Sequence, residues 1–102
     1  MSEFAQVAAV SDVPVGGTLR VPVGEKWLSL YNVDGEIFAT ADECSHAVAS
    51  LAQGCLTGHV IECPRHGATF DVRTGKNLTF PAVAPVKHYE VRVEDGSIWV
   101  AV

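Results

Sequence analysis

Two Asp-Gly dipeptides, Asp34-Gly35 and Asp95-Gly96, constrain the fold of this 102-residue chain more than any other feature. Asp-Gly readily adopts the positive backbone angles of a two-residue hairpin turn. Each dipeptide lies between two short runs rich in β-branched and aromatic residues, which is the pattern of paired strands. The sequence therefore predicts two antiparallel hairpins, with strands over residues 27–33 and 36–40, and over 88–94 and 97–102.

The rest of the chain has the same character. Residues 4–9 form a further expected strand, and residues 18–23 alternate between apolar and polar side chains, with Arg20 on the face opposite Leu19 and Val21. No 12-residue window carries the apolar stripe of an amphipathic helix. Short strands at close spacing predict an all-β fold, a small antiparallel sandwich or barrel, and the length predicts a single domain over residues 1–102.

Charge and hydropathy exclude several classes of protein. The chain has 7 Lys plus Arg against 12 Asp plus Glu, a formal charge of -5, so we expect it to bind neither nucleic acid nor an anionic membrane. The uncharged stretch at residues 47–61 is too short and too polar for a transmembrane helix. No Lys or Arg precedes Arg20, so a secretory signal peptide is not expected. We predict a soluble, cytoplasmic protein.

Two short motifs concentrate the metal-binding residue types. Cys44-Ser45-His46 lies in a long connection between the strand ending near Thr40 and a strand expected over His59–Glu62, and Cys63-Pro64-Arg65-His66 follows that strand. Each motif, called a box below, carries one cysteine and one histidine on what we expect to be a turn. Two ligands on one turn lose little extra chain entropy when they bind the same metal. The two boxes together therefore predict a four-ligand metal site.

Two cysteines and two histidines suit either a tetrahedral zinc ion or a [2Fe-2S] cluster with two histidine ligands. The C-x-H spacing of the first box is uncommon in zinc sites, where C-x2-4-C and H-x3-5-H dominate. The spacing favours the iron-sulfur cluster, and it leaves zinc open as the alternative.

At this point the sequence resembles a known family, the Rieske-type ferredoxins of bacterial aromatic-ring-hydroxylating dioxygenase systems. The resemblance covers nearly the whole chain and is strongest from about Ile37 onward. The residues that carry it are Phe38-Ala39-Thr40, Cys44-Ser45-His46, Ser50-Leu51, Gly54, Cys63-Pro64-Arg65-His66-Gly67, Phe70, Arg73-Thr74-Gly75-Lys76, Pro81-Ala82 and Pro85.

The resemblance implies a fold and a set of ligands. The fold is the Rieske domain, an antiparallel β-sandwich of three sheets, with a cluster-binding subdomain inserted as two loops at about residues 42–58 and 63–70. Cys44 and Cys63 would bind the inner iron of one [2Fe-2S] cluster, and His46 and His66 would bind the outer iron.

The resemblance also implies a function. The chain would be a single-electron carrier and not itself an enzyme. It would take electrons from an NAD(P)H-dependent flavoprotein reductase and pass them to a terminal oxygenase, as a monomer in solution. Two rivals remain: the Rieske-like small subunit of an assimilatory nitrite reductase, and a zinc-stabilised interaction module that uses the same four ligands.

Departures from related proteins refine this class. Respiratory and photosynthetic Rieske proteins join their two loops by a disulfide, but Ala49 and Arg65 stand at those cysteine positions here. Those proteins also place serine and tyrosine hydroxyls near the cluster sulfurs, where Ala68 and Phe70 stand in this chain. Without these donors, we expect a reduction potential near the low end of the Rieske range.

Other conspicuous residues have plainer interpretations. We expect Cys55 to be a small packed or partly exposed residue, and His59 and His88 to lie on the surface. Trp27 and Trp99 are expected to pack in the core or on a sheet face. For Asp42 and Glu43, just before Cys44, two interpretations stay open: part of a docking surface, or ordinary solvated loop residues.

Overall fold

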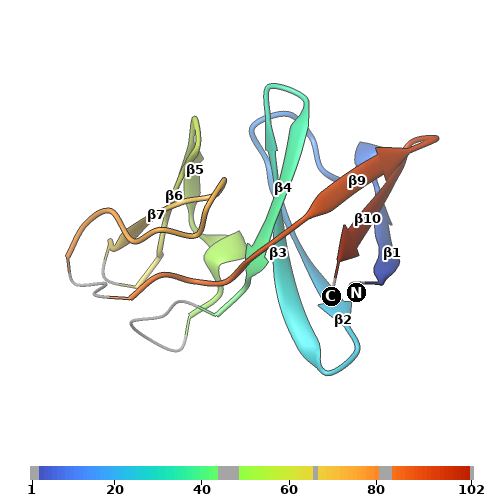
Figure 1. Ribbon diagram of the computed structural model, residues 1–102. Coiled ribbons are helices and arrows are strands. Elements are labelled where there is room, and N and C mark those ends of the chain that lie inside the picture. Colours follow the sequence, from blue (N-terminus) through green and yellow to red (C-terminus); the bar gives the residue numbers. More distant parts are fainter. Residues whose placement is uncertain (1–2, 44–48, 66, 81–83, 102) are drawn as a thin grey trace.

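The computed structural model describes residues 3–43, 49–65, 67–80 and 84–101, and in these ranges the regular secondary structure is almost entirely β-strand (Figure 1). The strands are β1 Phe4–Ala9, β2 Thr18–Val23, β3 Lys26–Val33, β4 Glu36–Ala41, β5 Cys55–Thr57, β6 Val60–Glu62, β7 Thr69–Asp71, β8 His88–Tyr89, β9 Val91–Glu94 and β10 Ser97–Ala101. Two short 3-10 helices accompany them, η1 Val10–Asp12 and η2 Leu51–Gln53. No helix in these ranges is long and apolar enough to span a bilayer.

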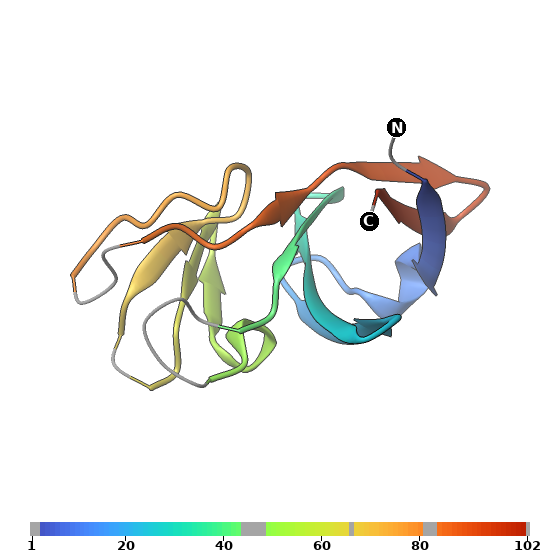
Figure 2. The same cartoon turned by 60° about the horizontal axis from the view of Figure 1, so that its bottom comes forward.

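The strands form three antiparallel sheets, as the family resemblance implied. Their orders are β1-β10-β9, β2-β3-β4-β8 and β5-β6-β7. The first and third sheets lie at opposite ends of the molecule with the four-stranded sheet between them, as both ribbon views show (Figures 1 and 2). We call the β5-β6-β7 sheet and the loops around it the cluster side, and the β1-β10-β9 sheet with its face of the central sheet the basal side.

Both predicted hairpin turns are confirmed. Val33 pairs with Glu36 across Asp34-Gly35, whose φ angles are 53° and 95°. Glu94 pairs with Ser97 across Asp95-Gly96, whose φ angles are 51° and 76°. Positive φ at both central residues is the geometry whose twist matches that of the flanking strands. Asp tolerates this backbone region better than most residues, and Gly tolerates it without strain.

The central strand β3 separates two hydrophobic cores. Residues 28–33 are all buried, and the side chains of a strand alternate between its two faces. Leu28 and Leu30 belong to the basal core, whereas Tyr31 and Val33 belong to the cluster-side core. The central sheet is therefore covered on both faces.

Two expectations about the strands need correction. The expected strand 88–94 is divided: β8 pairs with β4 in the central sheet, whereas β9 pairs with β10 in the first sheet. The chain changes sheets at Glu90, whose carbonyl accepts a hydrogen bond from the Ala101 amide at 2.9 Å. The long connection after Thr40 contains η2 and β5, which its poor strand alternation did not reveal.

Candidate metal centre

Of the four predicted ligands, Cys63 lies in the described part of the chain. Cys44, His46 and His66 lie outside the described residues. Cys63 directly follows β6 and is only 1% exposed. The expectation that a strand positions the second box is confirmed, although that strand begins at Val60 and not at His59.

A tight turn holds the second box. The Cys63 amide donates to the Ala68 carbonyl at 2.7 Å, and the Gly67 amide donates to the Cys63 carbonyl at 3.1 Å. Gly67 has φ 75°, a conformation that favours glycine. These two hydrogen bonds bring the chain back on itself within the box, so Cys63 is held by its backbone on both sides.

The residues on either side of the first box are hydrogen-bonded to each other. Glu43 and Ser50 form an isolated antiparallel bridge, and the Leu51 amide donates to the Asp42 carbonyl at 2.8 Å. The chain therefore enters and leaves residues 44–49 at one point. We call residues 44–49 the first cluster loop.

Close backbone packing brings the described residues that flank the two boxes to the same end of the molecule. β5 pairs with β6 through Cys55 and Glu62, next to Cys63. A Cβ atom on Gly54 would lie 1.9 Å from the Glu62 carbonyl oxygen, so only glycine fits there. Residues from both boxes' surroundings line one surface cavity of about 470 Å³, formed by Ala49, Ser50, Gln53, Pro64 and Arg65.

The surroundings of Cys63 suit a metal-bound thiolate. Its neighbours in the cluster-side core are apolar and include Ile61, Ala68 and Phe70, each fully buried. A thiolate placed among such groups needs a cation to compensate its charge. An iron centre bound to the sulfur supplies that charge, so the described part of the site fits the predicted cluster.

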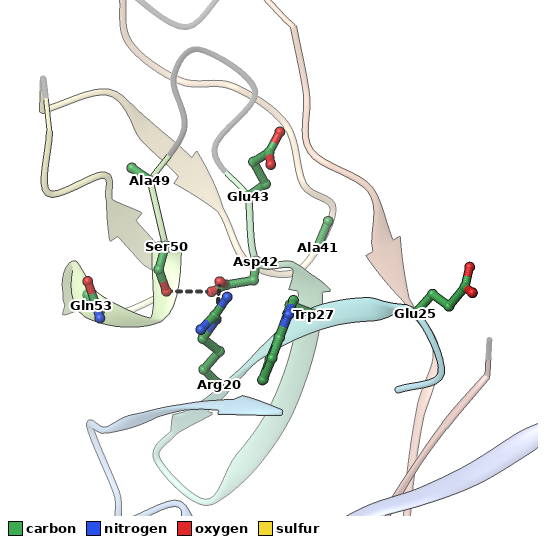
Figure 3. Close-up of a pocket in the computed structure, with 9 residues that line it drawn as sticks. All are labelled: Arg20, Glu25, Trp27, Ala41, Asp42, Glu43, Ala49, Ser50 and Gln53. Carbon is green, nitrogen blue, oxygen red and sulfur yellow. Dashed lines mark hydrogen bonds and ion pairs between the residues drawn. The ribbon is translucent and has the colours of Figure 1, made fainter. Parts of the chain in front are cut away.

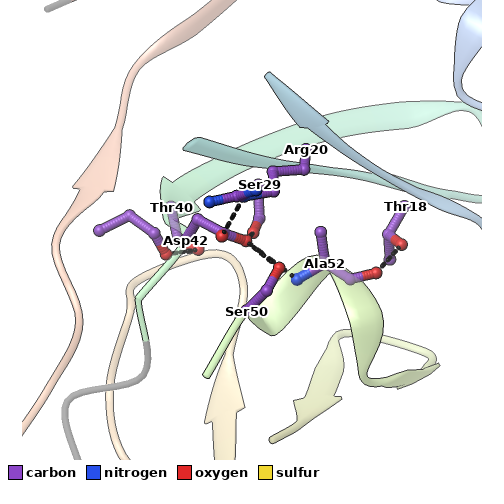
Figure 4. A network of polar contacts seen from close by, with 8 residues as sticks. Thr18, Arg20, Ser29, Thr40, Asp42, Ser50 and Ala52 are labelled. Carbon is purple, nitrogen blue, oxygen red and sulfur yellow. Dashed lines mark hydrogen bonds and ion pairs between the residues drawn. The ribbon is translucent and has the colours of Figure 1, made fainter. Parts of the chain in front are cut away.

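Asp42 has a role that the sequence did not predict. Its side chain is buried and forms a polar network with Arg20, Ser29, Ser50 and the Ala52 amide (Figures 3 and 4). Burial raises the pKa of the Asp42 carboxyl, but hydrogen bonds from Ser29, Ser50, Ala52 and Arg20 outweigh it and lower the pKa below its usual value. Both interpretations of Asp42, docking residue and solvated residue, were wrong.

The surface beside this network is formed by Trp27. The residue is 48% exposed, and the Arg20 guanidinium lies 3.9 Å from the centroid of its ring (Figure 3). Trp27 therefore packs on a sheet face and not in the core. Trp27 and Glu43 both line a cavity of about 480 Å³. Glu43 is exposed to solvent, unlike Asp42 beside it.

The structure also places the cysteine and the two histidines that lie outside the boxes. Cys55 is exposed on β5, and His88 is exposed on β8, as expected. His59 is half-buried just before β6, with its ring edge-on to Phe38 at 5.6 Å between centroids. Its surface assignment therefore holds only in part.

Comparison with known proteins decides the family. The model of the Rieske [2Fe-2S] domain matches residues 3–90. The chain belongs to the Rieske [2Fe-2S] domain family. This membership resolves the choice between zinc and iron: the cofactor is a Rieske-type [2Fe-2S] cluster.

Individual relatives are similar over nearly their full length. The chain is 43% identical to Ferredoxin CarAc of Metapseudomonas resinovorans, over 96% of this chain and 92% of the relative. It is also 43% identical to the ferredoxin component of the naphthalene 1,2-dioxygenase system of Pseudomonas putida, over 96% and 94%. A chain in the solved complex of reduced oxygenase and oxidized ferredoxin in carbazole 1,9a-dioxygenase superimposes with a TM-score of 0.91, at 41% identity over 99% and 94%. The predicted Rieske fold is thereby confirmed.

Proposed function

We propose that this Rieske protein is the single-electron ferredoxin of an aromatic-ring-hydroxylating dioxygenase system. It receives electrons from an NAD(P)H-dependent flavoprotein reductase and delivers them to a terminal oxygenase. The observation that carries the proposal is the extent of the similarity: it spans more than nine-tenths of both chains in the comparison with the naphthalene dioxygenase ferredoxin. The match is to a ferredoxin component over almost its whole length.

The ligands in this proposal are Cys44 and Cys63 for the inner iron and His46 and His66 for the outer iron. When bound, the cluster accepts and releases one electron. The chain's own contribution is to hold Cys63 in a hydrogen-bonded turn and to exclude water from it. The loops about 42–58 and 63–70 form the cluster-binding part of what we take to be a single domain.

The surface around the second box suits a transient partner. Pro64 and Arg65 are exposed, and so are the apolar side chains of Leu78, at 45%, and Phe80, at 84%. The Leu78 amide donates to the Thr69 carbonyl at 2.8 Å, which places this apolar segment beside the strand that follows the box. Exposed apolar groups next to the redox site support docking of the oxygenase there. We further propose a monomer in the cytoplasm, because a carrier must diffuse between its two partners.

Removing one predicted ligand tests the proposal most directly. Protein purified with Cys44→Ala or His66→Ala should lack the normal cluster. Wild-type protein should contain two irons and two acid-labile sulfides per chain. Cys55→Ala is the matched control, because Cys55 is exposed and lies outside both boxes. Iron and sulfide analysis and electron paramagnetic resonance of the reduced protein measure the outcome. Anaerobically purified wild-type protein without inorganic sulfide would refute the proposal.

Function is tested by reconstitution. Wild-type protein should restore NAD(P)H-dependent turnover to a mixture of a dioxygenase reductase and its oxygenase, with Cys44→Ala as the inactive control. Turnover that does not depend on the added ferredoxin would contradict the carrier assignment.

A further inference from the structure

The carboxylate of Asp42 connects segments that are far apart in the sequence. Its Oδ1 accepts hydrogen bonds from Ser29 Oγ at 2.5 Å, Ser50 Oγ at 2.8 Å and the Ala52 amide at 3.2 Å. Its Oδ2 accepts from Arg20 Nε at 2.8 Å. Figure 4 shows the donors converging from two strands of the central sheet, β2 and β3, and from the segment around η2.

The backbone of Asp42 strengthens the same junction. Its amide donates to the Trp27 carbonyl on β3 at 3.0 Å, and its carbonyl accepts from the Leu51 amide at 2.8 Å. Asp42 therefore bonds to the central sheet on one side and to the far end of the first cluster loop on the other. One residue thus joins the segments before and after the first cluster loop to the central sheet.

The two carboxylate oxygens of Asp42 accept hydrogen bonds from different groups. Oδ1 holds Ser50 and Ala52, which close the base of the loop, and also Ser29 on the sheet. Oδ2 holds Arg20, whose guanidinium in turn stacks on the exposed Trp27 ring. The Asp42 side chain is 3% exposed and the Arg20 side chain 45%, so the carboxylate is shielded from water although its arginine partner is half-exposed.

We propose that Asp42 is a positioning residue that fixes the first cluster loop on the central sheet, and that it thereby limits movement of the cluster ligands during electron transfer. The assignment rests on the proposed ligands in that loop, Cys44 and His46. A site whose surroundings move little between redox states exchanges electrons with less reorganisation. Asp42 itself binds no iron in this assignment: it acts through the loop that it anchors.

Two substitutions separate the contributions of the carboxylate. Asp42→Asn can keep an oxygen toward Ser50 and Ala52, but it then places an amide N–H against Arg20 and breaks that link. Asp42→Ala removes every side-chain bond. The matched control is Asp71→Asn, because the Asp71 carboxylate also pairs with an arginine, Arg73 at 2.9 Å, but in the described part of the chain it accepts its hydrogen bonds from that one neighbouring residue.

The measurements are made on purified holoproteins. They are the rate of iron release to a chelator at neutral pH, the linewidths of the electron paramagnetic resonance spectrum after reduction, and amide hydrogen exchange at Leu51 and Ala52. Asp42→Ala should release iron about tenfold faster or more, since it loses several hydrogen bonds to a charged group. It should also broaden the spectrum and lose amide protection. Asp42→Asn should fall between Asp42→Ala and wild type, and Asp71→Asn should match wild type.

Equal iron-release rates and unchanged spectra in a cluster-loaded Asp42→Ala protein would overturn this assignment alone. Wild-type protein that holds no cluster would overturn the proposed function, and this assignment with it. If Asp42→Ala does not fold, Ser50→Ala and Ser29→Ala replace it, because each deletes one bond to the same oxygen. Ser50→Ala, which opens the loop base, should then speed iron release more than Ser29→Ala does, and the reverse order would contradict the assignment.

Discussion

The two hydrophobic cores on either side of β3 are built differently. The basal core lies between long paired strands: β2 and β3 pair over six consecutive positions, and β1 pairs with β10 over five, with a shift of register between Gln6 and Ala8. The cluster-side core is covered by β5, β6 and β7, which are three residues each. Its buried members are Tyr31, Val33, Leu51, Ile61, Cys63, Ala68, Phe70, Val72 and Val86.

This difference has an energetic consequence. Short strands form few ladder hydrogen bonds, so the cluster side relies on side-chain packing, loop contacts and the bound cofactor. Close approaches between backbone segments are examples of the loop contacts on the cluster side. A Cβ on Gly75 would lie 2.0 Å from the Val86 carbonyl oxygen, which parallels the contact of Gly54 with Glu62. We therefore expect the cluster side to open at a lower free energy than the basal side.

Truncating one large side chain in each core tests this comparison with the largest expected effect. Phe70→Ala on the cluster side should cost about 3–5 kcal/mol locally, and Leu28→Ala on the basal side about 2–5 kcal/mol. Both residues are fully buried. Hydrogen exchange should show that Phe70→Ala exposes the amides of β5 to β7 while the basal amides stay protected, whereas Leu28→Ala lowers protection throughout. Uniform loss of protection in both variants would show that the two cores unfold as one unit.

Alkaline pH should lower the free energy of unfolding through ionisation of Tyr31, a residue of the strand that separates the two cores. Burial raises the pKa of its phenol to about 12, despite side-chain hydrogen bonds with Thr40 and Ser29 that lower it. Because the folded pKa lies above the unfolded value, this stability is present below pH 10 and is lost as pH rises through 12. The loss should reach about 2–3 kcal/mol.

Tyr31→Phe should reduce the fall in the free energy of unfolding at alkaline pH. Denaturant unfolding between pH 9 and 12 measures it, because this window brackets the ordinary tyrosine pKa of about 10. Tyr89→Phe in the basal core is the control. Burial also raises the pKa of Tyr89, but its side chain lies nearer the surface, at 9% exposed for the residue against 0% for Tyr31. An alkaline decline that persists unchanged in Tyr31→Phe would assign it to other groups.

A hydroxyl introduced into the cluster-side core should have the smallest effect. Ala68 is fully buried in the same core as Cys63, and its carbonyl accepts from the Cys63 amide. If the new hydroxyl of Ala68→Ser bonds a cluster sulfur, the midpoint potential should rise by about 20–60 mV, which corresponds to about 0.5–1.5 kcal/mol. Ala39→Ser is the basal control, since Ala39 is 1% exposed in the other core. A potential unchanged by Ala68→Ser, measured by spectroelectrochemistry, would contradict the expectation of a low potential set by missing hydroxyls.

Local sequence signals predicted the basal side well. Asp-Gly turns, alternating residues in 18–23 and long apolar runs all report interactions between chain neighbours, and these strands formed as expected. On the cluster side the same approach failed for β5, because a three-residue strand offers too few positions for alternation to show. Outside the cluster side it failed at the division of residues 88–94 between the central sheet and the basal sheet, because the change of sheet depends on partners elsewhere in the chain.

The sequence by itself determined the antiparallel class, the two boxes and the family, because turn chemistry and ligand spacing are local properties of the chain. Only the tertiary structure decided the environment of individual charges. Asp42 precedes the first box in what looked like a polar loop, yet Arg20 and Ser29 reach it across 22 and 13 positions and make it a buried anchor. The stability of a buried carboxylate depends on donors brought together by folding, and their sequence separation leaves no local pattern to detect.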